Sequence, residues 1–162
     1  MVVWSVLVLA AVVLTEAAVP DPPNTGITTV GSLKLATAAD CAGVVAFSAS
    51  EATTDLSRLI FAQTLVDKGV GYVAQTGIFT THCPGLYQFS FAGYGSSNLR
   101  LTLKKKLNKS DSWTPVIGVG SGGGSNLILM DCEAGDHVAV FVDAGKIMEG
   151  GTFTGYRIAK KQ

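Results

Sequence analysis

The residues best suited to covalent chemistry in this chain are three cysteines, Cys41, Cys83 and Cys132. In an oxidising compartment such thiols pair as disulfides, and an odd number leaves one of them either free or bonded to a second chain. Cys41 lies just before the first expected strand. No zinc spacing such as C-x-x-C occurs.

The two histidines, His82 and His137, do not indicate an active site. A serine hydrolase needs a serine on a strained turn with a histidine as base, and no G-x-S-x-G occurs here. The H-E-x-x-H spacing of zinc hydrolases is absent as well. His137 alternates with Ala139 and Phe141, which is typical of a residue at the end of a strand. The sequence therefore predicts a protein that is not an enzyme, with no catalytic residue.

A glycine-rich stretch, GVGSGGGS at residues 118–125, has the composition of a nucleotide loop. It lacks the following lysine and serine or threonine that such a loop uses, so we interpret it as a flexible connection between strands that is open to a role in recognition. The nearby carboxylates of Asp131, Glu133 and Asp136 are assigned to hydrogen bonds within a turn. The sequence predicts no cofactor and no metal ligand.

Lys104, Lys105 and Lys106, together with Lys109, form the main local cluster of positive charge. Because side chains alternate along a strand, Lys104 and Lys106 face opposite to Lys105. We favour a solvated edge strand whose lysines discourage aggregation. The alternative is an edge that binds anions such as acidic glycans or lipopolysaccharide.

Asn108-Lys109-Ser110 is an N-glycosylation sequon in a polar stretch between two expected strands. A turn position in a secreted chain favours its use, so we predict a glycan on Asn108.

The first residues predict secretion. Residues 2–14 form an apolar run of signal-peptide length, and the small residues that follow offer a cleavage site after Ala17. We expect a signal peptide at 1–17, an extended leader at 18–40 and a globular head at 41–160; a retained membrane anchor is the weaker alternative. Lys plus Arg and Asp plus Glu number 12 each, so no broad basic face for nucleic acid is expected.

From residue 43 onward, β-branched and aromatic runs alternate with Gly, Pro, Asn, Asp and Ser, and no segment has a sustained helical period. Short strands at this spacing predict an all-β sandwich or jelly roll. The expected strands are 44–48, 58–66, 77–80, 86–94, 99–107, 114–119, 127–131, 137–143 and 152–159.

Three motifs follow one another along the chain: TGIFTTHCPGLYQFSF at residues 76–91, GDHV at 135–138 and TFTGY at 152–156. The first places Tyr87, Phe89 and Phe91 on one face of a strand. Together the motifs resemble the globular-head family of complement C1q, over nearly all of the expected mature chain. The resemblance implies a two-sheet antiparallel jelly-roll sandwich of the C1q and tumour necrosis factor type.

The resemblance also implies a homotrimer. Residues 44–47 and 138–142 are apolar on both faces of their expected strands. Covering loops would explain this pattern, but we favour a three-fold subunit interface, mostly because of the resemblance.

In that topology, the strand after Cys83 and the strand before Cys132 are antiparallel neighbours. The resemblance therefore implies an intrachain disulfide between Cys83 and Cys132, closing a loop worth about 4 kcal/mol in the chain-entropy model. Cys41 then remains to link two chains or to stay free.

The function implied by the resemblance is that of a secreted recognition protein, a lectin-like module of innate immunity that binds glycans or cell-surface proteins. No collagen-like Gly-X-Y stalk is present, and residues 114–125 lack the carboxylates that supply a calcium site in some relatives. The alternatives are a receptor ligand of the cerebellin or tumour-necrosis-factor type and a matrix component cross-linked through Cys41. The residues expected to bind ligand lie in two apical loops and on the lysine strand: Gly95, Ser96, Asn98, Asn126, Lys104, Lys105 and Lys106.

Overall fold

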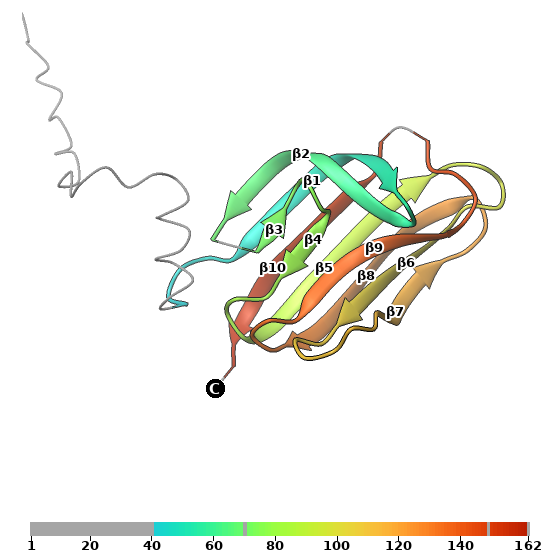
Figure 1. The fold of residues 1–162 in the computed structure, drawn as a ribbon. Coiled ribbons are helices and arrows are strands. Elements are labelled where there is room, and N and C mark those ends of the chain that lie inside the picture. The colour runs from blue at the N-terminus through green and yellow to red at the C-terminus, as the bar shows by residue number, and fades with distance from the viewer. Residues whose placement is uncertain (1–40, 70, 149, 162) are drawn as a thin grey trace, which may run out of the picture.

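The computed structural model describes residues 41–69, 71–148 and 150–161, so the expected signal peptide and leader lie outside it. Every regular element in the described residues is a β-strand (Figure 1). The ten strands are β1 (Ala46–Asp55), β2 (Arg58–Lys68), β3 (Tyr72–Val73), β4 (Ile78–Thr80), β5 (Gly85–Tyr94), β6 (Arg100–Lys106), β7 (Thr114–Val119), β8 (Gly123–Cys132), β9 (His137–Ala144) and β10 (Thr152–Lys160). A search of the described residues for a helix able to cross a membrane finds none.

The strands form two layers. In one, β2, β1, β10, β5 and β8 are neighbours in that order, and in the other β3, β4, β9, β6 and β7 are neighbours. All these pairs are antiparallel, and one residue pair, Arg58 with Phe141, joins β2 to β9 across the layers. Strands distant in sequence therefore lie side by side, with β10 between β1 and β5. This is the expected two-sheet antiparallel jelly roll.

Aromatic side chains fill the space between the layers. Tyr87, Phe89 and Phe91 are all buried, as the alternation along β5 requires. Phe47 packs against Tyr72 with ring centroids 4.6 Å apart and against Phe153 at 4.9 Å. The other large buried side chains are Phe61, Phe79, Leu59, Leu99, Leu101, Leu103, Val138 and Val140.

One glycine of the TFTGY motif is explained by this packing. A Cβ atom on Gly155 would lie 2.6 Å from the Phe47 ring and 2.7 Å from the Phe89 ring. Real Cβ atoms do not approach other atoms so closely, so any larger residue would displace the aromatic core. The motif is therefore a consequence of how the two rings meet.

The glycine-rich stretch differs from the expected loop. Most of it is strand, because β7 runs to Val119 and β8 begins at Gly123, leaving a tight turn between them. Gly123 pairs with Tyr94 and has φ +93°, and a Cβ there would meet the Gly93 carbonyl oxygen at 2.2 Å. Glycine thus lets β8 pair with β5 over its whole length. The short strand β3 was not predicted.

The doubly apolar run in β9 is covered within its own chain. Ala139 and Phe141 point away from the core yet are 0% and 8% exposed. The Trp113 ring packs edge-on against Phe141 at 5.0 Å, and the Lys104 ammonium lies 4.8 Å from the same ring. For residues 138–142 the covering of the strand by its own chain, rather than a subunit interface, accounts for the pattern.

Candidate functional site

The disulfide joins Cys41 to Cys83, with Cα atoms 5.4 Å apart, and Cys132 is a buried free cysteine. The expected Cys83–Cys132 bridge is therefore wrong, although β5 and β8 do pair as predicted. In that pairing Cys132 lies opposite Gly85, two residues past Cys83. Cys83 precedes the strand, where it meets the start of the described chain.

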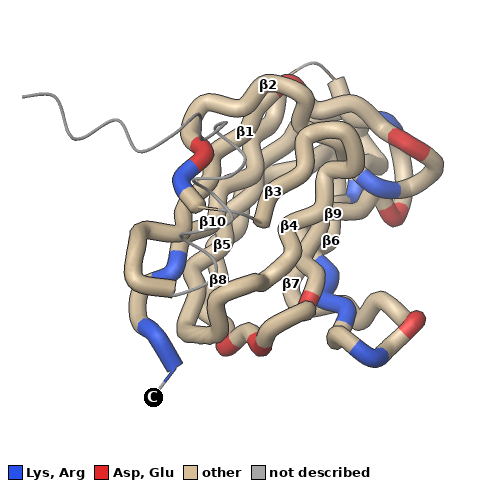
Figure 2. Tube along the Cα trace, turned by 60° about the vertical axis from the view of Figure 1, so that its left-hand side comes forward, with Lys and Arg blue, Asp and Glu red and all other residues tan. Residues whose placement is uncertain are grey.

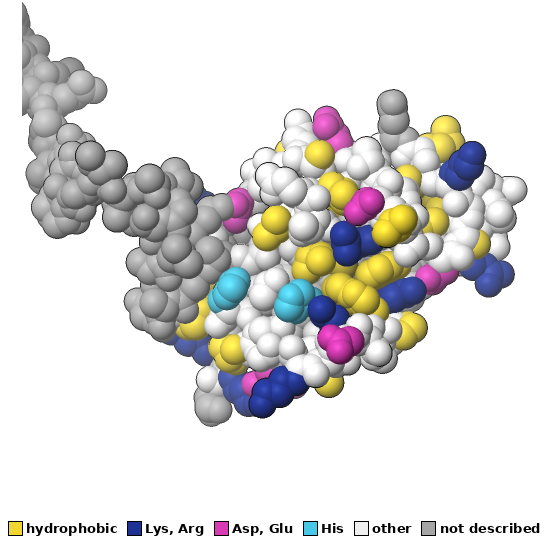
Figure 3. All heavy atoms as spheres, in the orientation of Figure 1, with side chains coloured by type: hydrophobic (Ala, Val, Ile, Leu, Met, Phe, Trp, Pro, Cys, Tyr) yellow, Lys and Arg dark blue, Asp and Glu magenta, His cyan; other side chains and the backbone are white. Residues whose placement is uncertain are grey.

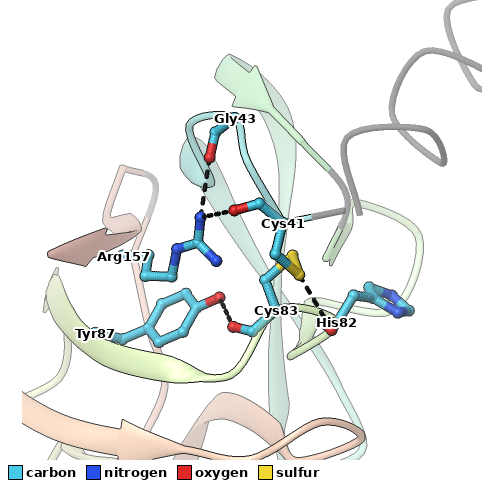
Figure 4. The surroundings of a disulfide bond; sticks show 6 residues. All are labelled: Cys41, Gly43, His82, Cys83, Tyr87 and Arg157. Atoms are coloured by element: carbon cyan, nitrogen blue, oxygen red, sulfur yellow. Dashed lines mark hydrogen bonds between the residues drawn. A yellow bond between two sulfur atoms is a disulfide. The ribbon is translucent and has the colours of Figure 1, made fainter. Parts of the chain in front are cut away.

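The segment holding Cys41 is fixed to the head by more than sulfur (Figure 4). One guanidinium nitrogen of Arg157 donates to the carbonyl oxygens of Cys41 at 2.7 Å and Gly43 at 3.0 Å. The Tyr87 hydroxyl donates to the Cys83 carbonyl oxygen at 2.6 Å. Cys41 is thus held in an intrachain bond, so both the free-thiol and the interchain alternatives are wrong. The alternative function, a matrix component cross-linked through Cys41, therefore loses the cysteine that was to form the cross-link.

Cys132 is 1% exposed and belongs to the core. Burial raises the pKa of its thiol to about 11, and Lys105 only partly offsets that effect. Because the thiolate is the reactive form, this cysteine is chemically inert in the folded protein. Its role is packing.

The three lysines of β6 have three different surroundings. β6 lies between β7 and β9, so the expected solvated edge is wrong. Lys105 points to the base of the sandwich, where its ammonium lies 2.8 Å from the Asp136 carboxylate and donates to the Asp131 carbonyl oxygen. Lys104 and Lys106 lie on the opposite side, as alternation predicts.

Asp136 organises the turn between β8 and β9. Its carboxylate is 1% exposed and accepts the backbone N–H groups of Glu133 at 2.9 Å and Asn108 at 3.2 Å. Burial raises the pKa of Asp136, but the hydrogen bonds from Lys105 and the two N–H groups outweigh it and hold the pKa below 3.8. Lys105 and Asp136 are therefore a structural pair, and neither presents a charge to a ligand.

Lys104 is neutralised at the surface. Its ammonium lies 2.8 Å from Asp143, whose carboxylate also accepts a hydrogen bond from the Thr102 hydroxyl. Burial raises the pKa of Asp143, and the hydrogen bonds from Lys104 and Thr102 outweigh it, so the net shift is downward. Lys106 instead lies 5.8 Å from the centre of the Trp113 ring.

The structure brings the two predicted apical loops together. Gly95 N–H donates to the Gly122 carbonyl oxygen at 3.4 Å, and Gly123 N–H donates to that of Leu99 at 3.2 Å. Ser96 Oγ bonds Asn98 Oδ1 at 2.8 Å. Asn126 lies lower on β8, where it donates to the Gly118 carbonyl oxygen. The lysines lie elsewhere, because β6 runs from the apex at Arg100 to the opposite end at Lys106.

The loop between β9 and β10 also belongs to the apical group, and the sequence analysis did not include it. Lys146 N–H donates to Ser96 Oγ at 2.9 Å, and Met148 N–H donates to the Tyr94 carbonyl oxygen. Met148 and Tyr94 are 66% and 65% exposed. The glycines at 145, 150 and 151, around a short apolar stretch, were the signal for this loop.

The layer that contains β5 and β8 has an unusual outward surface, which we call the open face. It consists of the partly exposed side chains that the strand registers align: Ala46, Ser48, Ser50, Gln88, Ser90, Ala92, Ser125, Leu127, Leu129, Thr152, Thr154 and Tyr156. None carries a charge, and Figure 2 shows charged residues gathered mainly at strand ends and turns. Leu127 and Leu129 are 52% and 51% exposed.

Two pairs of polar side chains on the open face are hydrogen-bonded to each other. Tyr156 donates to Gln88 at 3.1 Å, and the Ser48 and Thr154 hydroxyls lie 3.0 Å apart. A groove of about 530 Å³ crosses the face beside Ser90, Leu127 and Thr152. These two pairs keep their hydrogen bonds when the face is covered, which lowers the cost of removing it from water.

Asn108 lies in the exposed turn between β6 and β7. The expected sequon is thus at the surface, on the side of the molecule that carries the Asp136 turn.

The fold has solved relatives. The globular domain of a zebrafish complement 1qA protein matches with a TM-score of 0.61 and 22% identity, over 74% of this chain and 100% of that chain. Eiger TNF from S. frugiperda matches with a TM-score of 0.58 and 12% identity, over 74% and 95%. Murine APRIL matches with a TM-score of 0.53 and 12% identity, over 70% and 99%.

A search of curated proteins finds no match to the sequence. Residues 44–158, in contrast, match the description of the C1q domain. The matched segment begins two residues before β1 and ends within β10, so it spans the whole sandwich. The chain therefore belongs to the C1q domain family.

Proposed function

We propose that this protein is a secreted, homotrimeric recognition protein, a lectin-like module of innate immunity. Proteins with a C1q domain are typically extracellular, ligand-binding and non-enzymatic, and C1q and TNF homologues form trimers. The observation that carries the proposal is the open face. It is uncharged, contains two internal hydrogen-bonded pairs, and exposes Leu127 and Leu129.

A lone soluble domain has no need of such a surface. Interface cores are depleted in charged residues, and the open face has none. Its most exposed apolar side chains, Leu127 and Leu129, lie side by side on β8. Its twelve aligned residues span four strands, a width suited to contact with another copy. The groove near Leu127 would receive a side chain of a neighbouring copy.

A trimer presents three identical sites, so weak contacts with single sugars add up on a repetitive surface. The open face is then hidden, which leaves the apical loops and the outward side of the other layer for ligands. We place ligand binding at Gly95, Ser96 and Asn98 in the apical group, with Asn126 just below. The residues of this group lie in turns and at strand ends held by a rigid scaffold, as binding residues commonly do.

Sedimentation equilibrium and a glycan array on the same secreted sample test the proposal together. A mass of three chains with binding to defined sugars supports it. A single-chain mass at micromolar concentration contradicts the assembly. A trimer that binds no glycan but binds cells after their glycans are removed supports the receptor-ligand alternative instead.

Glycosylation of Asn108 is tested on reducing gels. Treatment with an N-glycosidase should lower the apparent mass of the wild type and leave that of Asn108→Gln unchanged.

A further inference from the structure

The outward side of the second layer carries an aromatic surface that the assembly leaves open. We call it the Trp113 surface: Lys106, Trp113, His137 and Phe141. β6 and β9 place Lys106 opposite His137, and Thr102 opposite Phe141. Figure 3 shows an apolar patch on this side of the molecule with charged side chains and a histidine around it.

Trp113 packs against two aromatic rings of β9. Its ring meets Phe141 edge-on at 5.0 Å and His137 at 6.5 Å with an interplanar angle of 86°. Phe141 is buried, whereas Trp113 is only half-buried. A rigid, partly exposed indole offers contact area at a low cost in conformational entropy.

Lys106 supplies the available charge. Of its two neighbours on β6, Lys104 is paired with Asp143 and Lys105 with Asp136. Among the ion pairs between described residues, none includes Lys106. Its ammonium lies over the Trp113 ring, 5.8 Å from the ring centre, so a positive charge with no ion-pair partner among the described residues accompanies the indole.

His137 adds a directed polar atom. Its Nδ1 lies 2.8 Å from the Gly135 carbonyl oxygen, and since a carbonyl only accepts, Nδ1 carries the hydrogen. The other ring nitrogen, Nε2, then accepts a hydroxyl hydrogen when the ring is neutral and donates to an anion when it is protonated. The hydrogen bond from Nδ1 and the edge-on contact with Trp113 together orient the half-buried ring.

We propose that the Trp113 surface binds an anionic saccharide. The apolar C–H face of a sugar ring packs on Trp113, its carboxylate or sulfate pairs with Lys106, and a hydroxyl or the anion meets His137. A purely apolar partner fits poorly because charged groups surround the patch, and a plain anion would leave the indole unused. This inference rests on the proposed recognition function and assigns it a ligand class and a second site.

Tryptophan fluorescence reads this site directly. The chain has two tryptophans, Trp4 and Trp113. Trp4→Phe therefore leaves Trp113 as the only tryptophan, which is excited selectively at wavelengths that tyrosine does not absorb, whether or not the N-terminus is removed on secretion. The background also carries Asn108→Gln, so that no glycan of the protein itself competes nearby. The probes are a heparin tetrasaccharide, which carries sulfate and carboxylate, a hyaluronan tetrasaccharide, which carries carboxylate only, and neutral maltotetraose.

We expect a saturable change in Trp113 emission with at least one anionic probe. Maltotetraose should bind at least tenfold more weakly than that probe. Lys106→Gln should weaken binding at least tenfold, while Lys160→Gln, which removes the same charge from the far end of β10, should change it less than twofold. Response to heparin alone identifies sulfate as the anion, and response to both identifies the carboxylate.

No saturable change with either anionic probe, or equal loss in the two lysine variants, overturns the inference. Calorimetry on Trp113→Ala, with circular dichroism to confirm its fold, gives a second reading, since stacking predicts a loss of at least tenfold. The outcome is separable from the proposed function: array binding that survives both Lys106→Gln and Trp113→Ala overturns this site and leaves the recognition role standing.

Discussion

The two outward surfaces of the sandwich differ in how their apolar side chains are covered. On the layer with β9, Phe141 and Ala139 are buried by residues of the same chain, with Trp113 and Lys104 above them. On the layer with β8, Leu127 and Leu129 are half-exposed and nothing in the described chain covers them. An apolar residue on an outward surface is thus either covered by its own chain or left exposed by it, and only the packing in the structure distinguishes the two cases. The first surface is covered within one chain, and we propose that another copy covers the second.

The largest expected effect comes from a charge on the open face. Leu129→Asp would bury a carboxylate with no partner if this face is covered, at a cost of about 3 to 5 kcal/mol at each contact. Sedimentation should then find single chains in place of trimers. Val116→Asp, on exposed β7, should leave the mass unchanged. A trimer that tolerates Leu129→Asp would show that the open face is not the interface.

Phe141→Ala tests the other surface. Removing a buried phenylalanine costs about 3 to 5 kcal/mol through lost burial and the cavity left behind. Thermal or denaturant unfolding should show this loss, while the mass in solution stays that of the wild type. Dissociation without loss of subunit stability would mean that Phe141 serves an interface after all, and the contrast between the two surfaces would fail.

Much of this fold, and less of the candidate site, could be predicted from the sequence. Alternation in β5 predicted a strand with one buried aromatic face, and the spacing of short strands predicted a sandwich or jelly roll. The order of three motifs then indicated the jelly roll through the resemblance to the C1q head family. The sequence could not show whether the apolar residues of β9 are covered by loops or by a subunit interface. The reason is that Trp113, which covers Phe141, lies in an otherwise polar stretch with no periodicity. The predicted disulfide was wrong for a different reason. Pairing of β5 with β8 was right, but a shift of two residues decides which sulfur atoms meet.

The next effect is acid sensitivity at the base of the sandwich. Because the pKa of Asp136 is lowered in the fold, its contribution is fully present above pH 3.8 and is lost as pH falls through the folded pKa. Asp136→Asn removes the carboxylate that pairs with the mostly buried Lys105 ammonium and should cost about 3 kcal/mol at neutral pH. Urea unfolding from pH 2 to 7 should show the wild type losing stability below pH 4.

The variant supplies the matched curve. Asp136→Asn should lose less stability across the same acid range, since the carboxylate that titrates there is gone. Parallel curves for the two proteins would place the acid response in other carboxylates and contradict the structural role of this pair.

The smallest effect separates the two sides of β6. Lys104→Met keeps the aliphatic stem over Phe141 and removes only a partly exposed ion pair with Asp143, so we expect a loss within about 1 kcal/mol. Lys105→Met strips the buried Asp136 of its partner and should cost severalfold more. High salt should reduce the loss in the first variant and hardly touch the second, because exposed pairs are screened and buried pairs are not. Equal losses in the two variants would mean that neighbouring lysines on one strand share one environment, which the alternation of β6 between base and surface does not allow.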